Sequence, residues 1–145
     1  MQAHVVAWYT GKRIFLTPME LNKYGNEVYL IKRNWEPSVN RIDLDEGIYG
    51  GQNSAIGAIN LAIALGANPI YLLGYDMKCE GKTHYHKGYP DRDPIQFNAK
   101  LKEYKKEIEE LSKLWRESNT AIFNLGPDSD LTCFPFADLN RVLGA

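Results

Sequence analysis

The chain has 145 residues, of which 44% are apolar and 24% charged, a composition that is ordinary for a single globular domain over 1–145. Its formal net charge of −1 at pH 7 gives no electrostatic reason to expect a nucleic-acid or membrane partner. Cys79 and Cys133 lack CxxC spacing, so neither a zinc ribbon nor a disulfide framework is indicated, and we expect a cytoplasmic protein.

The first third of the chain predicts short strands and one brief helix. Residues 5–9, 13–17 and 27–32 are rich in β-branched and aromatic side chains, which is typical of strands. Pro18 suits the first position of a brief helix, which Gly25 would end. Residues 34–49 contain a proline and several polar residues, and we expect an irregular excursion there that serves binding, pairing or a lid.

The stretch 50–76 begins as a glycine-rich loop that leads into a helix. Gly50 and Gly51 allow a sharp turn and a close approach of the backbone to a ligand, and Asn53 or Ser54 is a good N-cap. The backbone amides at such a helix start attract anions, so these four residues are candidate phosphate contacts. Neither GxxxxGK[ST] nor GxGxxG after a strand is present, and a plain structural loop is an equal alternative.

The remainder of that stretch predicts a buried helix and a buried strand. Residues 55–65 are apolar on nearly every side except at Asn60, so the helix should be covered all round, with Gly66 at its C′ position. Residues 69–74 are apolar without alternation, which predicts a strand buried on both faces of a parallel sheet. Asp76 follows the carboxyl end of that strand, where open α/β sheets bind their ligands.

A second irregular stretch, 77–94, is the candidate active-site or binding loop. His84 and His86 are two residues apart, so both imidazoles would point to one side of an extended segment. Together with Asp76 they are candidates for acid and base catalysis or for metal binding, and silent surface histidines are the alternative. Lys82 and other basic residues suit contact with a phosphorylated ligand.

The last third predicts helix, strand, turn and helix. Apolar residues recur at steps of four and three over 94–117, which predicts an amphipathic helix with a solvated opposite face. Residues 120–125 predict a strand, and 136–143 a short helix with Asp138 near its start.

The turn that follows the strand 120–125 contains further candidate binding residues. In a parallel sheet, Asn124 and Ser129 would emerge at the same edge as Asp76 and could face the ligand. Asparagine, aspartate and serine are also what any tight turn prefers, so a purely structural turn is the alternative.

The alternation of strands and helices predicts an α/β fold with a mainly parallel sheet flanked by helices on both faces. The pattern NSxxxAxxxAxxLGxxPIYLLGYDM, followed by GKTH and NLxPxSxLxxFP, covers about 50–143. It resembles the Rossmann-like superfamily of 6-hydroxymethylpterin diphosphokinase-like proteins and, more distantly, the bacterial CMP-sialic-acid sialyltransferases. Phage and bacterial proteins carry similar motifs.

The resemblance implies a Rossmann-like three-layer sandwich and roles for several residues. Ser54 and the loop before it would contact phosphates, and Asp76 would contact the nucleotide or a metal such as Mg²⁺. His84 or His86 would stand where the sialyltransferases use a histidine base. Members of the family usually begin with a strand and a GxGPSL loop, whereas this chain begins MQAHVVAWYTGK, so the first nucleotide-binding loop is expected to be missing.

Two functions follow as hypotheses. The first is a nucleotide-dependent transferase that moves a diphosphate or a sugar from an ATP or CMP-sugar donor, with Mg²⁺ as a candidate metal. The second, prompted by the missing loop, is a non-catalytic module that binds a small molecule or nucleotide, either alone or as a homo-oligomer. Both hypotheses imply a small-molecule nucleotide ligand.

Overall fold

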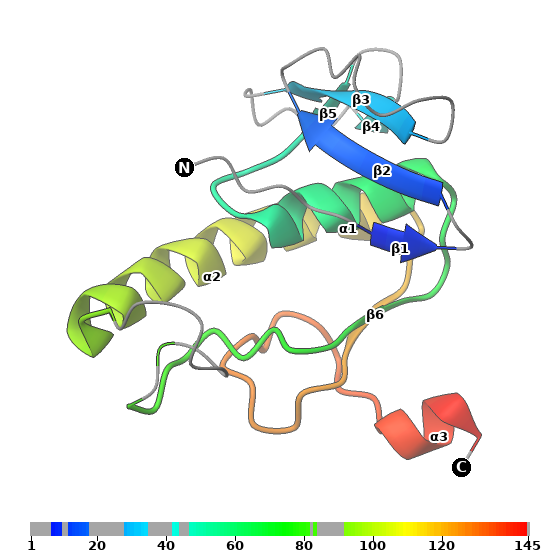
Figure 1. Ribbon diagram of the computed structural model, residues 1–145. Helices are drawn as coiled ribbons and strands as arrows, with labels where there is room; N and C mark the ends of the chain where they lie inside the picture. The colour runs from blue at the N-terminus through cyan, green and yellow to red at the C-terminus, as the bar shows by residue number, and fades with distance from the viewer. Residues whose placement is uncertain are drawn as a thin grey trace. The chain divides into compact units, whose positions relative to one another are not determined.

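The computed structural model describes residues 7–9, 12–17, 28–34, 42–43, 47–81, 83 and 92–144 (Figure 1). The chain divides into two compact units, Met1–Ala67 and Asn68–Ala145. Each unit combines strands with helix, so the chain is α/β, as the alternation of strands and helices in the sequence predicts. That all 145 residues form one domain stays a prediction.

The first unit contains a five-stranded mixed sheet in the order β1-β2-β3-β5-β4. β2 pairs in parallel with β3, β3 pairs in parallel with β5, and the two outer pairings, β1 with β2 and β4 with β5, are antiparallel. The predicted strands at 5–9, 13–17 and 27–32 are confirmed within the described residues. The brief helix expected after Pro18 lies outside them. The strands are Ala7–Tyr9 (β1), Lys12–Thr17 (β2), Val28–Asn34 (β3), Ile42–Asp43 (β4) and Gly47–Tyr49 (β5).

The expectation of an irregular excursion over 34–49 is wrong where the structure describes it, because β4 and β5 lie there. β5 joins the sheet through Arg33 opposite Ile48, and Ile48 is fully buried. Ile48 also packs against Leu61 of the following helix. A three-residue strand has too little pattern to predict from sequence, and its pairing depends on a partner strand elsewhere in the chain.

The helix α1 (Ser54–Ala64) begins and ends as predicted. The side chain of Asn53 caps it by accepting bonds of 2.9 and 3.3 Å from the amides of Ala55 and Ile56. Gly66 follows the C-cap residue with a φ of +77°, a left-handed conformation that glycine adopts without strain. The polar exception, Asn60, is buried and donates a 2.8 Å bond to the carbonyl of Tyr49, which ties α1 to the end of β5.

The second unit contains the parallel pair β6 and β7, with Leu72 opposite Asn124 in the register. The long helix has the predicted bounds and is capped by Asp93, and Asp138 caps the last helix. Buried apolar residues of the long helix, such as Ile108 and Trp115, form the core of this unit with Ile122 and others. The elements are Ile70–Leu72 (β6), Pro94–Glu117 (α2), Ile122–Asn124 (β7) and Leu139–Leu143 (α3).

One prediction about β6 is wrong, since this strand is not buried on both faces. Leu72 is 3% exposed, whereas Tyr71 is 41% exposed and stacks on Phe123 of β7 with ring centroids 5.6 Å apart. Successive side chains of a strand point to opposite faces of the sheet. Because only one face of the β6–β7 pair is covered, Leu72 on that face is buried and Tyr71 on the opposite face is exposed to solvent. Among the described residues, no helix has both the length and the apolar character needed to cross a membrane.

Candidate functional site

The candidate site lies where the loops after β6 and β7 meet. The amide of Leu125 donates a 2.9 Å bond to the carbonyl of Leu72, and the amide of Asp130 donates a 2.9 Å bond to the carbonyl of Asp76. The first bond continues the pairing at the end of β6, and the second joins the two loops beyond the strands. Asp76 is thereby held at the carboxyl edge of a parallel pair, with its side chain exposed.

Gly126 marks the point where three of the predicted site residues converge. A Cβ atom at this position would lie 3.6 Å from Oδ1 of Asp76, 3.4 Å from Oδ1 of Asn124 and 3.3 Å from Cβ of Ser129. The sequence prediction that these three residues share one edge therefore agrees with the geometry. The absence of a side chain at Gly126 leaves a small space bordered by two oxygen-bearing side chains.

The side chains of Asn124 and Ser129 are occupied in holding the turn. Asn124 accepts a 3.0 Å bond from the amide of Gly126 and donates a 3.0 Å bond to the carbonyl of Leu131. The hydroxyl of Ser129 donates a 2.6 Å bond to the carbonyl of Tyr75 and accepts a 3.0 Å bond from the amide of Leu131. These contacts favour the structural interpretation of both residues, as supports of the turn beside Asp76.

The residue after Asp76 has an unusual backbone. Met77 has a φ of +54°, in the left-handed region that residues other than glycine and asparagine rarely adopt. Such conformations persist only where the surrounding contacts hold them, and they occur often at binding sites. Asp76 is exposed and its Oδ1 borders Gly126, so among the described residues of this cluster its carboxylate is the group best placed to contact a ligand.

The charges beside the site are mixed. Nζ of Lys78 lies 3.2 Å from Oε1 of Glu80. The hydrogen bond to Glu80 is the main cause that raises the pKa of Lys78, and the negative charges of Asp130 and Asp128 raise it further. The part of the chain that the structure describes has no group of three His, Cys, Asp or Glu residues placed to hold a metal ion. Asp76 alone suits Mg²⁺ only if phosphate oxygens and water complete the octahedron, which is the usual arrangement for a metal bound with a nucleotide.

The glycine loop belongs to the first unit, and its geometry is explained by packing. Gly51 has a φ of +58°, and a Cβ atom there would lie 2.6 Å from Cδ1 of Ile56. Only glycine therefore fits this position. Gly50 is buried as well, while Ser54 is exposed at the start of α1. The amide nitrogen Nδ2 of Asn53 is buried, with no hydrogen-bond partner among the described residues.

Three predicted residues, Lys82, His84 and His86, lie outside the described residues, and their roles stay predictions. Two described residues of the same loop are hydrogen-bonded to each other. Thr83 is buried, and its hydroxyl accepts a 3.3 Å bond from the amide of Arg92 across the loop. The two ends of the histidine-containing segment are thus held close together.

Two residues that support the site, Asn98 and Gly126, were not predicted from the sequence. Asn98, in the first turns of α2, accepts a 2.8 Å bond from the amide of Cys79 and donates a 2.9 Å bond to its carbonyl. An asparagine inside a helix is a weak signal of such a bond, because its side chain favours contacts with backbone outside the helix. Gly126 could have been suspected because it directly follows the predicted strand 120–125 and precedes a Pro-Asp-Ser turn.

Comparison of the chain with protein-family models, with curated proteins and with solved structures gave no match. The resemblance of its motifs to the diphosphokinase-like superfamily therefore stays a prediction. The site is defined by the described residues around Asp76 and by the contacts that hold them.

Proposed function

We propose that this chain binds a nucleotide at the carboxyl edge of β6 and β7 and acts as a nucleotide-dependent transferase of diphosphate or sugar. The observation that supports the proposal is the convergence of Asp76, Asn124 and Ser129 on Gly126 at that edge. Ligands of open α/β sheets bind at such edges, outside the carboxyl ends of the strands. The finer architecture that goes with this proposal is a Rossmann-like sandwich with a mainly parallel sheet.

In this proposal, Asp76 orients the ligand. Its carboxylate either accepts hydrogen bonds from ligand hydroxyls or joins the coordination of a Mg²⁺ ion that arrives with the nucleotide phosphates. Asn124 and Ser129 keep the turn at Gly126 in the shape that leaves room beside Asp76. Positioning of this kind depends on rigid support, which the bond between Asp76 and Asp130 supplies.

In the transfer step, we assign proton transfer and charge neutralisation to residues of the loop 77–94. The imidazole of His84 or His86 would take the proton of an acceptor hydroxyl. The hydroxyl oxygen at the same time bonds to phosphorus or to the anomeric carbon of the sugar. The bond to the nucleotide leaving group breaks in the same step. Lys82 would neutralise phosphate charge, and the glycine loop with Gly50, Gly51, Asn53 and Ser54 is a separate candidate for phosphate contact.

A second candidate function is a module that binds a nucleotide without turning it over. The internal hydrogen bonds of Asn124 and Ser129 favour it, because both side chains are engaged in holding the turn and Asp76 is the exposed group of the cluster. A single carboxylate can select and orient a ligand, but the transfer reaction also needs a second group that accepts the proton of the acceptor hydroxyl.

Calorimetric titration with ATP, GTP, CTP and CMP, each with Mg²⁺, tests the binding that both candidates share. Absence of heat with all four at millimolar concentration would exclude both. Long incubation with ATP or with a CMP-sugar, followed by chromatography of the nucleotides, then separates them. Consumption of one donor that ceases in His84→Ala or His86→Ala supports the transferase, whereas binding with an unchanged donor supports the module.

A further inference from the structure

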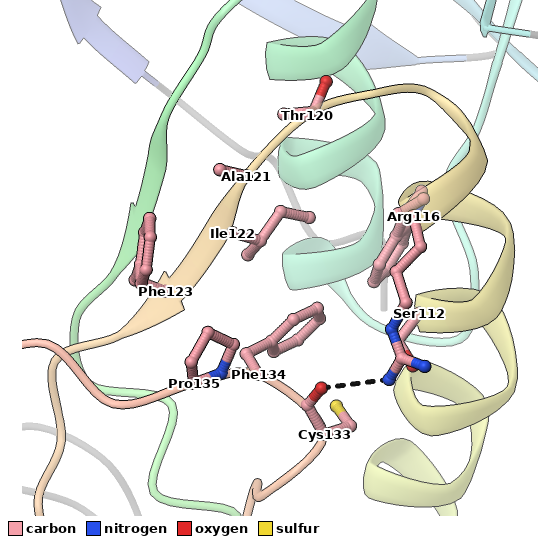
Figure 2. A pocket seen from close by; sticks show the side chains of 10 residues that line it. Ser112, Arg116, Thr120, Ala121, Ile122, Phe123, Cys133, Phe134 and Pro135 are labelled. Carbon is pink, nitrogen blue, oxygen red and sulfur yellow. Dashed lines mark hydrogen bonds between the residues drawn. The ribbon is translucent and has the colours of Figure 1, made fainter.

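The second unit contains a cavity of about 280 Å³ between the C-terminal half of α2, the strand β7 and the loop that follows it (Figure 2). Its lining shares no residue with the cluster around Asp76. Asn124 and Gly126 lie at the carboxyl end of β7, whereas the cavity is lined by the residues that lead into the strand and by its first two positions. It is therefore a separate site within the same unit.

The cavity walls are mainly aromatic and aliphatic. Trp115 is 2% exposed and Phe134 is 7% exposed, and their rings are stacked with centroids 6.1 Å apart and an interplanar angle of 22°. Figure 2 shows Ile122 and Phe134 pointing from β7 and the following loop toward α2. Because the two rings stack on each other and are nearly buried, a flat aromatic ligand would meet this wall at the ring edges, an arrangement that aromatic groups favour.

The edge of the cavity carries one charged group among the residues that line it, the guanidinium of Arg116. Its Nη2 donates a 3.2 Å bond to the carbonyl of Cys133, which holds the guanidinium at the edge (Figure 2). A guanidinium has five N–H donors, so this bond leaves donors for a carboxylate. Burial raises the pKa of the Cys133 thiol, so at neutral pH the thiol adds no negative charge that would oppose an anion.

We propose that this cavity is a binding site for a small aromatic carboxylate. The ring would lie against Trp115 and Phe134, and the carboxylate would be bound by Arg116. The volume is just below the range of about 300–1,000 Å³ that is common for ligand sites, so the ligand is limited to one or two fused rings. The mostly apolar lining with a single fixed cation matches the usual composition of such sites, in which a few polar groups set the orientation.

The test uses 2-naphthoate as the probe and Cys133 as the reporter, because its thiol lies in the cavity lining. Iodoacetamide labelling of the full chain is followed by mass spectrometry of the peptides that carry Cys133 and Cys79. Saturating 2-naphthoate should slow the alkylation of Cys133 at least threefold and leave that of Cys79, which is outside the lining, unchanged. Equal rates at Cys133 with and without millimolar 2-naphthoate would overturn the proposal.

Two charge-removing variants test the part assigned to Arg116. Arg116→Gln should weaken the binding of 2-naphthoate about tenfold, the change expected from the loss of a charge-assisted hydrogen bond. Lys113→Gln removes the same charge from an exposed position three residues earlier in α2 and should leave binding unchanged. Equal effects of the two variants would contradict recognition by Arg116. The neutral 2-naphthalenemethanol should bind the wild type and Arg116→Gln alike, which shows that the variant keeps its cavity.

Discussion

The amide of Asp130 donates a 2.9 Å hydrogen bond to the carbonyl of Asp76, although the two residues lie 54 positions apart in the chain. This bond joins the loop after β6 to the loop after β7. Ser129 adds a second connection through its 2.6 Å bond to the carbonyl of Tyr75. The carboxylate of Asp76 is therefore presented by two loops that are fixed to each other, and this supports its assignment as the ligand-orienting group.

The space at Gly126 can be filled with one methyl group. Gly126→Ala places a Cβ atom 3.6 Å from Oδ1 of Asp76 and 3.3 Å from Cβ of Ser129, which requires only a small shift of the serine. We expect the melting temperature to stay within a few degrees and nucleotide affinity to fall about tenfold. Calorimetry measures the affinity, and Pro127→Ala, at the exposed neighbouring position, is the control. Unchanged affinity in Gly126→Ala would place the ligand elsewhere.

The cap of α1 can be tested through stability. Asn53→Ala removes the oxygen that accepts bonds from Ala55 and Ile56, so the free energy of unfolding should fall by about 1 kcal/mol. Asn53→Ser keeps a capping oxygen and removes the buried amide nitrogen that has no partner among the described residues, so it should stay close to wild type. Urea denaturation measures both, and equal losses in the two variants would argue against the cap.

The bonds between Asn98 and Cys79 anchor the start of the candidate loop. Asn98→Ala breaks both bonds, whereas Asn98→Asp keeps the acceptor for the Cys79 amide and loses only the donor to its carbonyl. Hydrogen exchange at the Cys79 amide should be fastest in Asn98→Ala and intermediate in Asn98→Asp, because exchange follows local opening. Identical exchange in wild type and Asn98→Ala would show that other contacts hold the loop.

The reactivity of Cys133 should depend on pH in a defined direction. Burial raises the pKa of this thiol, while a hydrogen bond with Ser112 acts in the opposite sense. Fewer thiolates are present at a given pH than in a free cysteine, so alkylation at pH 8 should be slow and its midpoint should lie above the ordinary thiol pKa. Ser112→Ala should move the midpoint higher still. A midpoint at or below the ordinary value would contradict this assignment.

The same shift links pH to stability. The folded-state pKa of Cys133 lies above its unfolded-state value, so the folded state binds more protons between these two values. Its contribution to stability is fully present below the unfolded pKa and is lost as pH rises through the folded pKa. Cys133→Ala should remove this alkaline component of the stability profile in urea denaturation series.

Much of the second unit could be predicted from sequence because its signals are local. The bounds of α2 follow from the apolar steps of four and three over 94–117, and these agree with the observed helix. The sharing of one edge by Asp76 and Asn124 followed from the rule that parallel strands end together. These conclusions needed no knowledge of how distant segments pack.

Other features could not be predicted, because they depend on contacts between distant segments. β5 has only three residues, and its place in the sheet comes from its pairing with β3. The exposure of Tyr71 depends on which face of β6 is covered, which an unbroken apolar run does not encode. The convergence on Gly126 requires the two loops to be joined by backbone hydrogen bonds, and such bonds leave no mark on the sequence.

Calorimetric comparison of Asp76→Asn with Asp128→Asn tests the central claim most directly. Both variants remove one negative charge from exposed positions on the two joined loops, but only Asp76 borders the space at Gly126. We expect Asp76→Asn to keep its melting temperature within a few degrees and to weaken nucleotide binding by about 1–3 kcal/mol, with Asp128→Asn unchanged. Equal affinities in wild type and Asp76→Asn, or equal losses in both variants, would contradict the claim that Asp76 orients the ligand.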